Sequence, residues 1–266
     1  MSSVENAEVD SEVEDVRNIL SKLDMVAVNS AKDIYEYIMQ PFPIGLGKAV
    51  SKKERDELNL KDSTLVYGEI TFDMLGTVLE KIKKVYGRPN VGASGVSGII
   101  QNKGGIFYDL GAGTGKPVIA AAVYHNFDVC YGIELLEGLY SVSLDALNAY
   151  NTRGKAKLNR ETDTHCQMIQ GSFLKLSTKD WRDADIVFAN STCYDEVLMS
   201  SMAKIAGGMR KGSFFITLTK RLPSSDFAVL EYEMYKMSWG EATVFVMQKT
   251  TDPKQSLTGD DSDDDA

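Results

Sequence analysis

The sequence predicts an α/β protein with a sheet of seven strands, mostly parallel with an antiparallel strand at one end, and a small N-terminal helical lobe. Apolar strand-like runs alternate with helical patterns from residue 106 onward, which is typical of a parallel sheet covered by helices on both faces. A glycine-rich turn over residues 109–115 joins the first run to an Ala-rich helical pattern. Two β-like segments flank Gly240 and predict a final hairpin.

The N-terminal region is predicted to be helical from about residue 14 to residue 58, with a break at residues 41–47. Apolar side chains recur at i, i+3, i+4 and i+7, on one helix face: Val16, Ile19, Leu20 and Leu23. A further helix follows Thr71, which is a suitable N-cap. We therefore expect a helical lobe over residues 14–86. Residues 87–105 are rich in Gly, Ser and Asn and predict a flexible connection.

The main domain is expected over residues 106–249. Its predicted strands cover residues 106–110, 129–134, 166–169, 186–189, 213–219, 235–239 and 243–248, and its predicted helices cover residues 116–124, 135–151 and 195–209.

Charge is unevenly distributed along the chain. The net charge of the 266 residues is -9, but residues 1–16 and 250–266 each carry six acids and together one Lys, so the remainder carries about +2. We expect acidic disordered tails at residues 1–13 and 250–266. Such tails could contact basic proteins and would repel DNA, so direct DNA binding is not expected.

Targeting and redox signals favour a nuclear or cytoplasmic protein. The first residues lack the basic start and the apolar core of a signal peptide, and no apolar run approaches the roughly 20 residues that span a bilayer. The three cysteines show no metal-binding spacing, and an odd number favours a reducing compartment.

The glycine-rich turn after the first strand admits three interpretations. A phosphate-binding P-loop needs Gly-x-x-x-x-Gly-Lys-Ser/Thr, but Leu110 stands five residues before Gly115, and Pro117 follows Lys116. A dinucleotide G-x-G-x-x-G fingerprint also fails, because the glycines are Gly111, Gly113 and Gly115. The remaining pattern is similar to the Asp-x-Gly-x-Gly-x-Gly turn of S-adenosylmethionine-dependent methyltransferases.

Polar side chains at the predicted strand ends are the candidate ligand contacts, because open α/β sheets bind ligands there. Glu134 ends the second strand, where a carboxylate can accept both hydroxyls of a ribose; a solvated strand end is the alternative. Phe173 could cover an adenine ring or be a core aromatic. Asn190 could bind an amine or the methionine part of the cofactor.

Methyl transfer to a neutral amine requires alignment and desolvation more than acid–base chemistry. Aromatic walls would suffice, and Tyr67, Tyr194 and Trp239 are candidates. The sequence lacks an Asn/Asp-Pro-Pro-Tyr/Phe signature, which argues against many base and glutamine methyltransferases. Cys193 and the two histidines receive no catalytic role.

Five motifs in order together resemble the non-SET histone lysine methyltransferases of the disruptor-of-telomeric-silencing (DOT) type, which act on the globular core of histone H3. The resemblance covers about residues 65–248, and its motifs are Tyr67-Gly68-Glu69-x-x-Phe72-Asp73, Asp109-Leu110-Gly111-x-Gly113-x-Gly115, Tyr131-Gly132-x-Glu134, Gly171-x-Phe173-Leu174 and Val187-Phe188-x-Asn190. It implies a Rossmann-like class I methyltransferase that uses S-adenosylmethionine, with a histone or nucleosome as the leading partner and the nucleus as its location.

The resemblance also implies roles for individual residues. Residues 67–69 would form a loop over the methionine end of the cofactor. The implied cofactor contacts are Tyr67, Glu69, Asp109, Gly111, Gly113, Gly115, Glu134, Ser172, Phe173 and Asn190, and the implied catalytic residues are Asn190, Tyr194 and Tyr67.

Two departures from the family pattern leave the substrate open. Ser172 replaces an Asp that usually contacts adenine, and Ser191-Thr192 replace Asn-Phe after Asn190. The family's long basic nucleosome-binding segments have no counterpart. The alternatives are a methyltransferase of the same fold that acts on a non-histone protein or a small molecule, and an inactive cofactor-binding interaction module.

Overall fold

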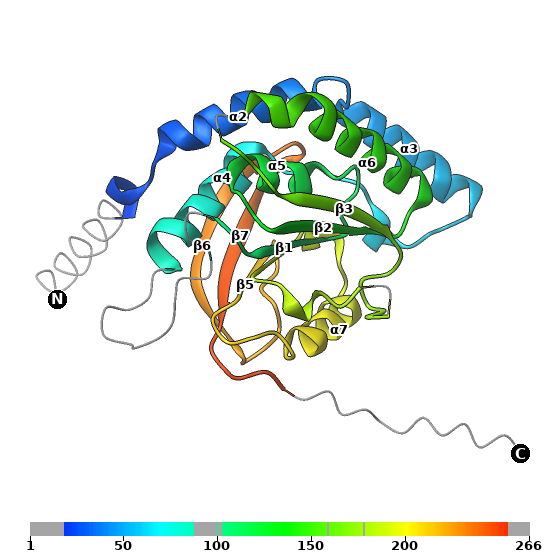
Figure 1. Ribbon diagram of the computed structural model, residues 1–266. Coiled ribbons are helices and arrows are strands. Elements are labelled where there is room, and N and C mark those ends of the chain that lie inside the picture. Colours follow the sequence, from blue (N-terminus) through cyan, green and yellow to red (C-terminus); the bar gives the residue numbers. More distant parts are fainter. Residues whose placement is uncertain (1–18, 88–99, 101–102, 159, 178, 255–266) are drawn as a thin grey trace, which may run out of the picture.

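The computed structural model describes residues 19–254 except residues 88–99, 101, 102, 159 and 178. These residues form a seven-stranded sheet of order β3-β2-β1-β4-β5-β7-β6 (Figure 1). Strands β1 to β5 are parallel, and β7 runs antiparallel to its neighbours β5 and β6. The predicted fold is confirmed. The strands are β1 (Ile106–Leu110), β2 (Val129–Glu134), β3 (His165–Gln170), β4 (Ile186–Ala189), β5 (Phe214–Leu218), β6 (Phe227–Met237) and β7 (Gly240–Lys249).

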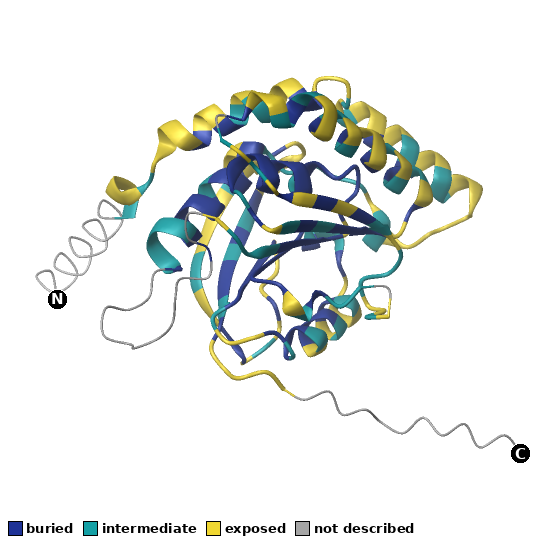
Figure 2. Ribbon diagram, viewed as in Figure 1, coloured by how far each residue is buried: buried dark blue, intermediate teal, exposed yellow. Residues whose placement is uncertain are grey.

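Helices cover the two faces of the sheet unequally. One face carries α2 (Met25–Met39), α4 (Phe72–Lys81), α5 (Lys116–Tyr124) and α6 (Glu137–Ala149), and α3 (Ile44–Glu57) packs on α6 (Figure 1). The opposite face carries α7 (Glu196–Ala206). Two apolar clusters result: α2, α4 and α5 contribute to one and α7 to the other. Figure 2 shows α5 and the central strands buried, whereas the outer sides of α2 and α3 are exposed.

The helix α4 shows how local signals set an element. Thr71 is its N-cap, as predicted, and its hydroxyl accepts a hydrogen bond from the Met74 amide at 3.3 Å. The buried side chains recur at helical spacing, which places them against the sheet and α2. The helix continues into a π-helical turn, η2 (Ile82–Tyr86).

Strand β6 is longer than predicted. It begins at Phe227, whereas the sequence pattern indicated a start at residue 235. The strand forms the edge of the sheet and includes a register shift between Val229 and Glu231, so its apolar alternation is interrupted. Glu231 and Glu233 face α4, where both bind the Lys81 ammonium at 2.7 and 2.9 Å. The two acidic residues of this strand therefore both pair with a lysine on α4.

The predicted domain boundaries fall partly outside the described residues. The N-terminal tail at residues 1–13, most of the connection at residues 87–105 and residues 255–266 of the C-terminal tail are not described. In the described part of the chain, no helix is long and apolar enough to cross a membrane.

Candidate active site

The turn after β1 requires glycine for two independent reasons. Gly111 and Gly113 have φ angles of 83° and 55°, which disfavour residues with a Cβ. A Cβ at Gly111 would lie 2.5 Å from the Tyr194 hydroxyl, and one at Gly113 would lie 2.7 Å from the Tyr67 ring. The backbone thus passes close under two tyrosines, and α5 begins directly after the turn.

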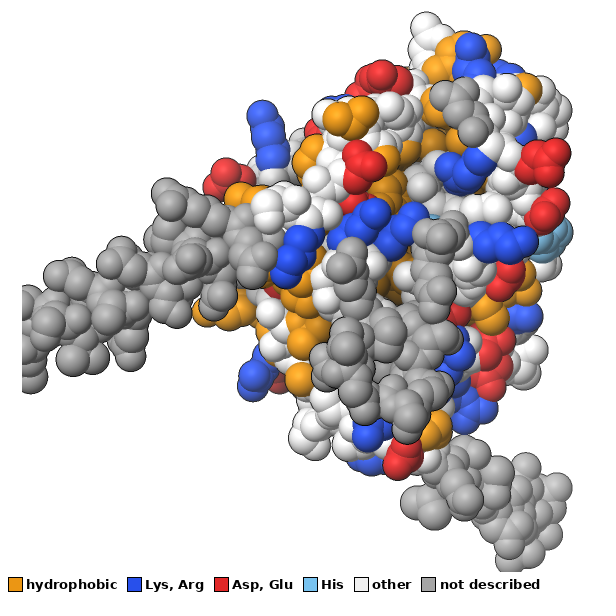
Figure 3. Space-filling model, turned by 60° about the vertical axis from the view of Figure 1, so that its left-hand side comes forward, with side chains coloured by type: hydrophobic (Ala, Val, Ile, Leu, Met, Phe, Trp, Pro, Cys, Tyr) orange, Lys and Arg blue, Asp and Glu red, His pale blue; other side chains and the backbone are white. Residues whose placement is uncertain are grey.

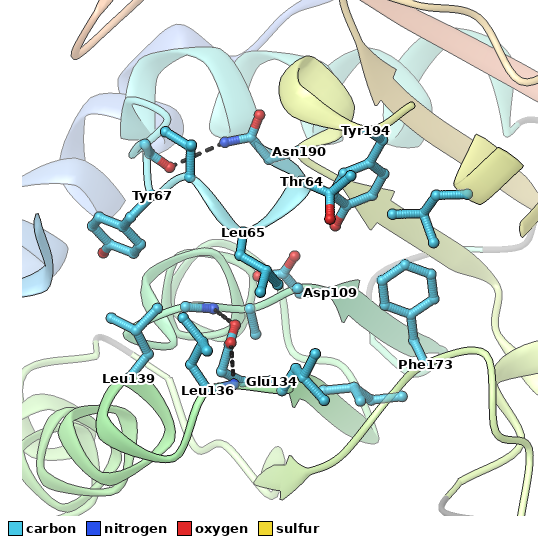
Figure 4. A pocket seen from close by; sticks show the side chains of 18 of the residues that line it. Thr64, Leu65, Tyr67, Asp109, Glu134, Leu136, Leu139, Phe173, Asn190 and Tyr194 are labelled. Atoms are coloured by element: carbon cyan, nitrogen blue, oxygen red, sulfur yellow. Dashed lines mark hydrogen bonds between the residues drawn. The ribbon is translucent and has the colours of Figure 1, made fainter. Parts of the chain in front are cut away.

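A cavity of about 360 Å³ lies over the carboxyl ends of β1, β2 and β4 (Figure 4). This volume is within the range of small-molecule sites. Every cofactor-binding or catalytic residue that the family resemblance implied lines it except Gly115, which has a φ of 77° and is the N-cap of α5. The predicted residues in its lining are Tyr67, Glu69, Asp109, Gly111, Gly113, Glu134, Ser172, Phe173, Asn190 and Tyr194.

Glu134 fixes the turn to the end of β2. Its side chain accepts hydrogen bonds from the amides of Gly113 at 2.7 Å and Leu136 at 2.8 Å (Figure 4). Burial raises the pKa of this carboxyl, and the bonds from backbone amides oppose that rise because they favour the charged form. The carboxylate is therefore held in one place at the floor of the cavity.

Asp109 is the unsatisfied group of the site. It is 1% exposed, and neither carboxylate oxygen has a hydrogen-bond partner among the described residues. Burial, followed by the nearby charge of Glu134, raises its pKa. A buried carboxylate without a partner is costly, so the site is suited to a ligand that brings a positive charge or a hydrogen-bond donor to Asp109.

A covering segment, residues 67–69, closes one side of the cavity. The Tyr67 hydroxyl donates to Glu69 Oε1 at 2.6 Å and lies 2.8 Å from the Thr114 hydroxyl. Glu69 Oε2 pairs with the Lys116 ammonium at 2.6 Å, and both side chains are about one-tenth exposed. The segment is thus joined to the start of α5.

The covering segment is also joined to the far end of the chain. The Asn190 amide nitrogen donates to the Gly68 carbonyl at 3.0 Å (Figure 4). The Ser238 amide donates to the Glu69 carbonyl at 3.2 Å. A Cβ on Gly68 would lie 2.8 Å from the Trp239 ring. Trp239 therefore packs on this segment and does not line the cavity.

The sequence of the matched region decides the family. The family model described as Histone methylation protein DOT1 matches residues 51–244, which include the covering segment, the glycine turn, Glu134 and Asn190. The chain belongs to this family. It is a class I methyltransferase, and the fold and family imply S-adenosylmethionine as the methyl donor. The resemblance inferred from five motifs is confirmed.

Two solved structures to which this DOT1-family chain is similar are distant from it in sequence. TrmN from Thermus thermophilus is 17% identical over 55% of this chain and 44% of that chain, with a TM-score of 0.43. A methyltransferase from Pyrococcus furiosus is 12% identical over 56% of this chain and 77% of that chain, with a TM-score of 0.44. No curated protein matches the chain. The fold therefore rests on the strand order itself.

The cavity of this DOT1-family chain fits the chemical groups of S-adenosylmethionine. The cofactor carries an ammonium group, which would supply the partner that Asp109 lacks. Glu134 would hold the ribose with the lone pairs that the backbone amides leave free. Ser172 lines the cavity, but its hydroxyl accepts a hydrogen bond from the Leu174 amide at 3.2 Å. The hydroxyl therefore stabilises the turn in which Ser172 lies.

The two tyrosines of the site form walls and do not act as bases. The Tyr194 hydroxyl donates to the Leu110 carbonyl at 2.9 Å, and its ring stacks on Phe173 with centroids 5.9 Å apart. Burial raises the pKa of both Tyr194 and Tyr67, and nearby carboxylates raise it further. Both phenols therefore stay protonated. The catalytic role predicted for them remains a prediction.

Ser191 and Thr192, which differ from the family pattern after β4, lie outside the lining of the cavity. Ser191 is fully buried, and its hydroxyl donates to the Leu218 carbonyl at 2.7 Å. The Thr192 hydroxyl lies 3.1 Å from Asn190 Oδ1 and 3.2 Å from the Thr219 hydroxyl. Neither Ser191 nor Thr192 is among the residues that line the cavity. These replacements therefore affect the support of Asn190 more than the shape of the cavity.

Sequence reasoning missed two supporting charges. Lys116 received no role in the sequence analysis, although it directly follows the glycine turn and binds Glu69. Glu54 on α3 accepts hydrogen bonds from the Glu137 and Gly138 amides at 2.8 and 2.7 Å, and thereby caps α6. Its partners are 83 and 84 residues away, and no local pattern reveals such a contact.

Proposed function

We propose that the chain transfers a methyl group from S-adenosylmethionine to the ε-amine of a protein lysine, with the globular core of histone H3 as the leading substrate and the nucleus as the site of action. The observation that carries the proposal is the match of residues 51–244 to a histone methylation family. The matched residues include those that line the cavity at the ends of β1, β2 and β4.

The cofactor would supply a methyl group on a positively charged sulfur, which is electrophilic enough to react with a neutral amine. The protein's part is then binding and alignment. Asp109 would hold the ammonium group of the cofactor and Glu134 its ribose on the cavity floor, and the covering segment would exclude water from one side.

The amine has to arrive without its proton. Tyr67 and Tyr194 stay protonated, and Asn190 does not titrate, so none of the three predicted catalytic residues accepts that proton. Their expected work is to desolvate the amine and orient it by van der Waals contact and hydrogen bonding. Asn190 is held in place from both sides, by the Gly68 carbonyl and the Thr192 hydroxyl.

The experiment is a methyl-transfer assay with radiolabelled cofactor on recombinant histones, octamers and nucleosomes, preceded by calorimetric titration of the cofactor. Gly113→Arg is the matched inactive control, because any side chain there meets the Tyr67 ring; circular dichroism would confirm that it folds. Label on histone H3 that disappears in the control supports the proposal.

Other outcomes reassign the substrate or the activity. Cofactor binding with label only on other proteins or on small molecules in a cell extract would replace the histone with another acceptor. Cofactor binding with no transfer to any acceptor would indicate an interaction module. Absence of cofactor binding would contradict the assignment of the cavity.

A further inference from the structure

A second feature of the surface lies at the end of the sheet opposite the cavity, near the C-terminus of α5. The π-helix η2 and residues 150–160, which include η3 (Tyr150–Gly154) and η4 (Lys155–Lys157), contain no Asp or Glu. Figure 3 shows a row of Lys and Arg side chains across this face. We call these six residues the basic edge: Lys83, Lys84, Arg153, Lys155, Lys157 and Arg160.

The basic edge is separate from the methyltransferase site. Helix α5 begins at the glycine turn and ends at Tyr124. The Lys83 ammonium lies 5.9 Å from the centre of the Tyr124 ring, and the Arg160 guanidinium donates to the Ala122 carbonyl at 2.9 Å. Both cations are therefore at the far end of α5, about 13 Å along its axis from the turn at 1.5 Å per residue.

None of the six cations has a carboxylate partner within 4 Å among the described residues. Arg153 and Lys155 instead donate to the backbone carbonyls of Ile38 and Thr164, at 2.8 and 3.1 Å. These bonds fix the direction of the side chains without neutralising them. The charges of Arg153 and Lys155 are thus held in place at this edge.

The neighbouring cations act on one another. Burial lowers the pKa of Lys83 most strongly, and the charges of Lys84 and Arg160 lower it further. The nearest opposing acid, Glu80, is already bonded to the Tyr124 hydroxyl and the Asp24 amide. An anion bound across Lys83 and Arg160 would relieve this repulsion.

The chemistry of the edge selects among anionic partners. Of the large aliphatic residues beside it, Ile82 and Leu158 are buried and Val85 is partly buried, so it offers little aliphatic surface for insertion into a bilayer. The adjacent exposed ring, Tyr37, is covered by Lys157 at 4.3 Å and Arg153 at 5.6 Å, which leaves it poorly placed to stack on unpaired bases. Cations that have no carboxylate partner among the described residues, beside a ring that is not free to stack, suit the phosphates of a duplex.

We propose that the basic edge binds the phosphate backbone of duplex DNA. The contact is sequence-independent and holds the molecule on DNA while the cavity, at the opposite edge of the sheet, stays free. The proposal reverses the expectation from net charge, because the acids that make the chain negative are concentrated in residues 1–16 and 250–266. It does not depend on the identity of the methyl acceptor.

The test is fluorescence anisotropy of a 20-base-pair DNA duplex titrated with the full-length chain at several salt concentrations. The edge variant is Lys83→Gln/Lys84→Gln/Lys157→Gln, three cations without hydrogen bonds among the described residues. The matched control, Lys52→Gln/Lys204→Gln/Lys211→Gln, removes the same charge from exposed positions elsewhere. Cofactor affinity, measured by calorimetry, should be unchanged in both variants and confirms that they fold.

We expect the wild type to bind the duplex and the edge variant to bind more than tenfold more weakly at low salt. The slope of log affinity against log salt should fall by about three, at about 0.9 per lost phosphate contact, while the control stays within about twofold of the wild type. Equal weakening in both variants, no wild-type binding at 50 mM salt, or tighter binding to single-stranded DNA or to vesicles containing phosphatidylserine would overturn the proposal.

Discussion

Replacing Glu134 by Ala tests the floor of the cavity most directly. The side chain accepts hydrogen bonds from two amides, at 2.7 and 2.8 Å, and is 6% exposed. The substitution leaves two buried donors without an acceptor, each of which costs about 1–3 kcal/mol. It also removes the carboxylate that would bind the ribose hydroxyls, at about 1.5–3 kcal/mol for each charge-assisted bond.

We therefore expect the free energy of unfolding to fall by about 2–6 kcal/mol and cofactor binding to weaken by about 3–6 kcal/mol, or roughly 140- to 20,000-fold at 1.4 kcal/mol per factor of ten. Urea unfolding and calorimetric titration with S-adenosylhomocysteine measure the two effects. Glu137→Ala, an exposed acid in the first turn of α6, is the control. Cofactor affinity equal to that of the wild type in the folded Glu134 variant would refute this account of the site.

Three further predictions concern Asp109, Thr219 and Glu54. Asp109 has a raised pKa in the free protein, and a bound cation stabilises its charged form. Cofactor binding should therefore release a proton and become tighter as the pH rises toward that pKa. Calorimetric titrations in buffers of different ionisation enthalpy measure the proton release. A binding enthalpy independent of buffer would count against this role. Thr219 is a β-branched residue with a φ of 64°, so Thr219→Gly should raise the free energy of unfolding by about 1 kcal/mol in urea titrations; a destabilised variant would show that its hydroxyl matters more than its backbone. Glu54→Ala should lower the free energy of unfolding by about 1–2 kcal/mol through loss of the α6 cap, whereas the exposed Glu57→Ala on the same helix should change it by less than about 0.5 kcal/mol; equal effects would rule out the cap.

The central sheet and the position of the cavity could be predicted because their signals are local. Buried parallel strands such as β4 and β5 are continuous apolar runs in the sequence, and a carboxylate or an amide directly after such a run lies at the ligand-binding edge. Asp109, Glu134 and Asn190 all follow this rule. The assignment to the family rests on the same local motifs.

The remainder could not be predicted because it depends on contacts between distant residues. Strand β6 lies at the edge, with Tyr232 and Met234 exposed and Glu231 paired to Lys81 across 150 residues, so its pattern lacks the apolar alternation of a half-buried strand. Lys116 binds Glu69 across 47 residues. The roles assigned to individual residues in binding and catalysis remain predictions.

The covering segment has a consequence for how the enzyme matures during synthesis. Residues 67–69 emerge early from the ribosome, yet one of their anchors, Ser238, follows 169 residues later than Glu69. At about 5–20 residues per second, a nascent chain would carry the glycine turn for several seconds before the β6–β7 hairpin exists to anchor residues 67–69 from that side. The site is therefore completed only after the hairpin has been synthesised, and a chain truncated before the hairpin would lack the Ser238 anchor of residues 67–69.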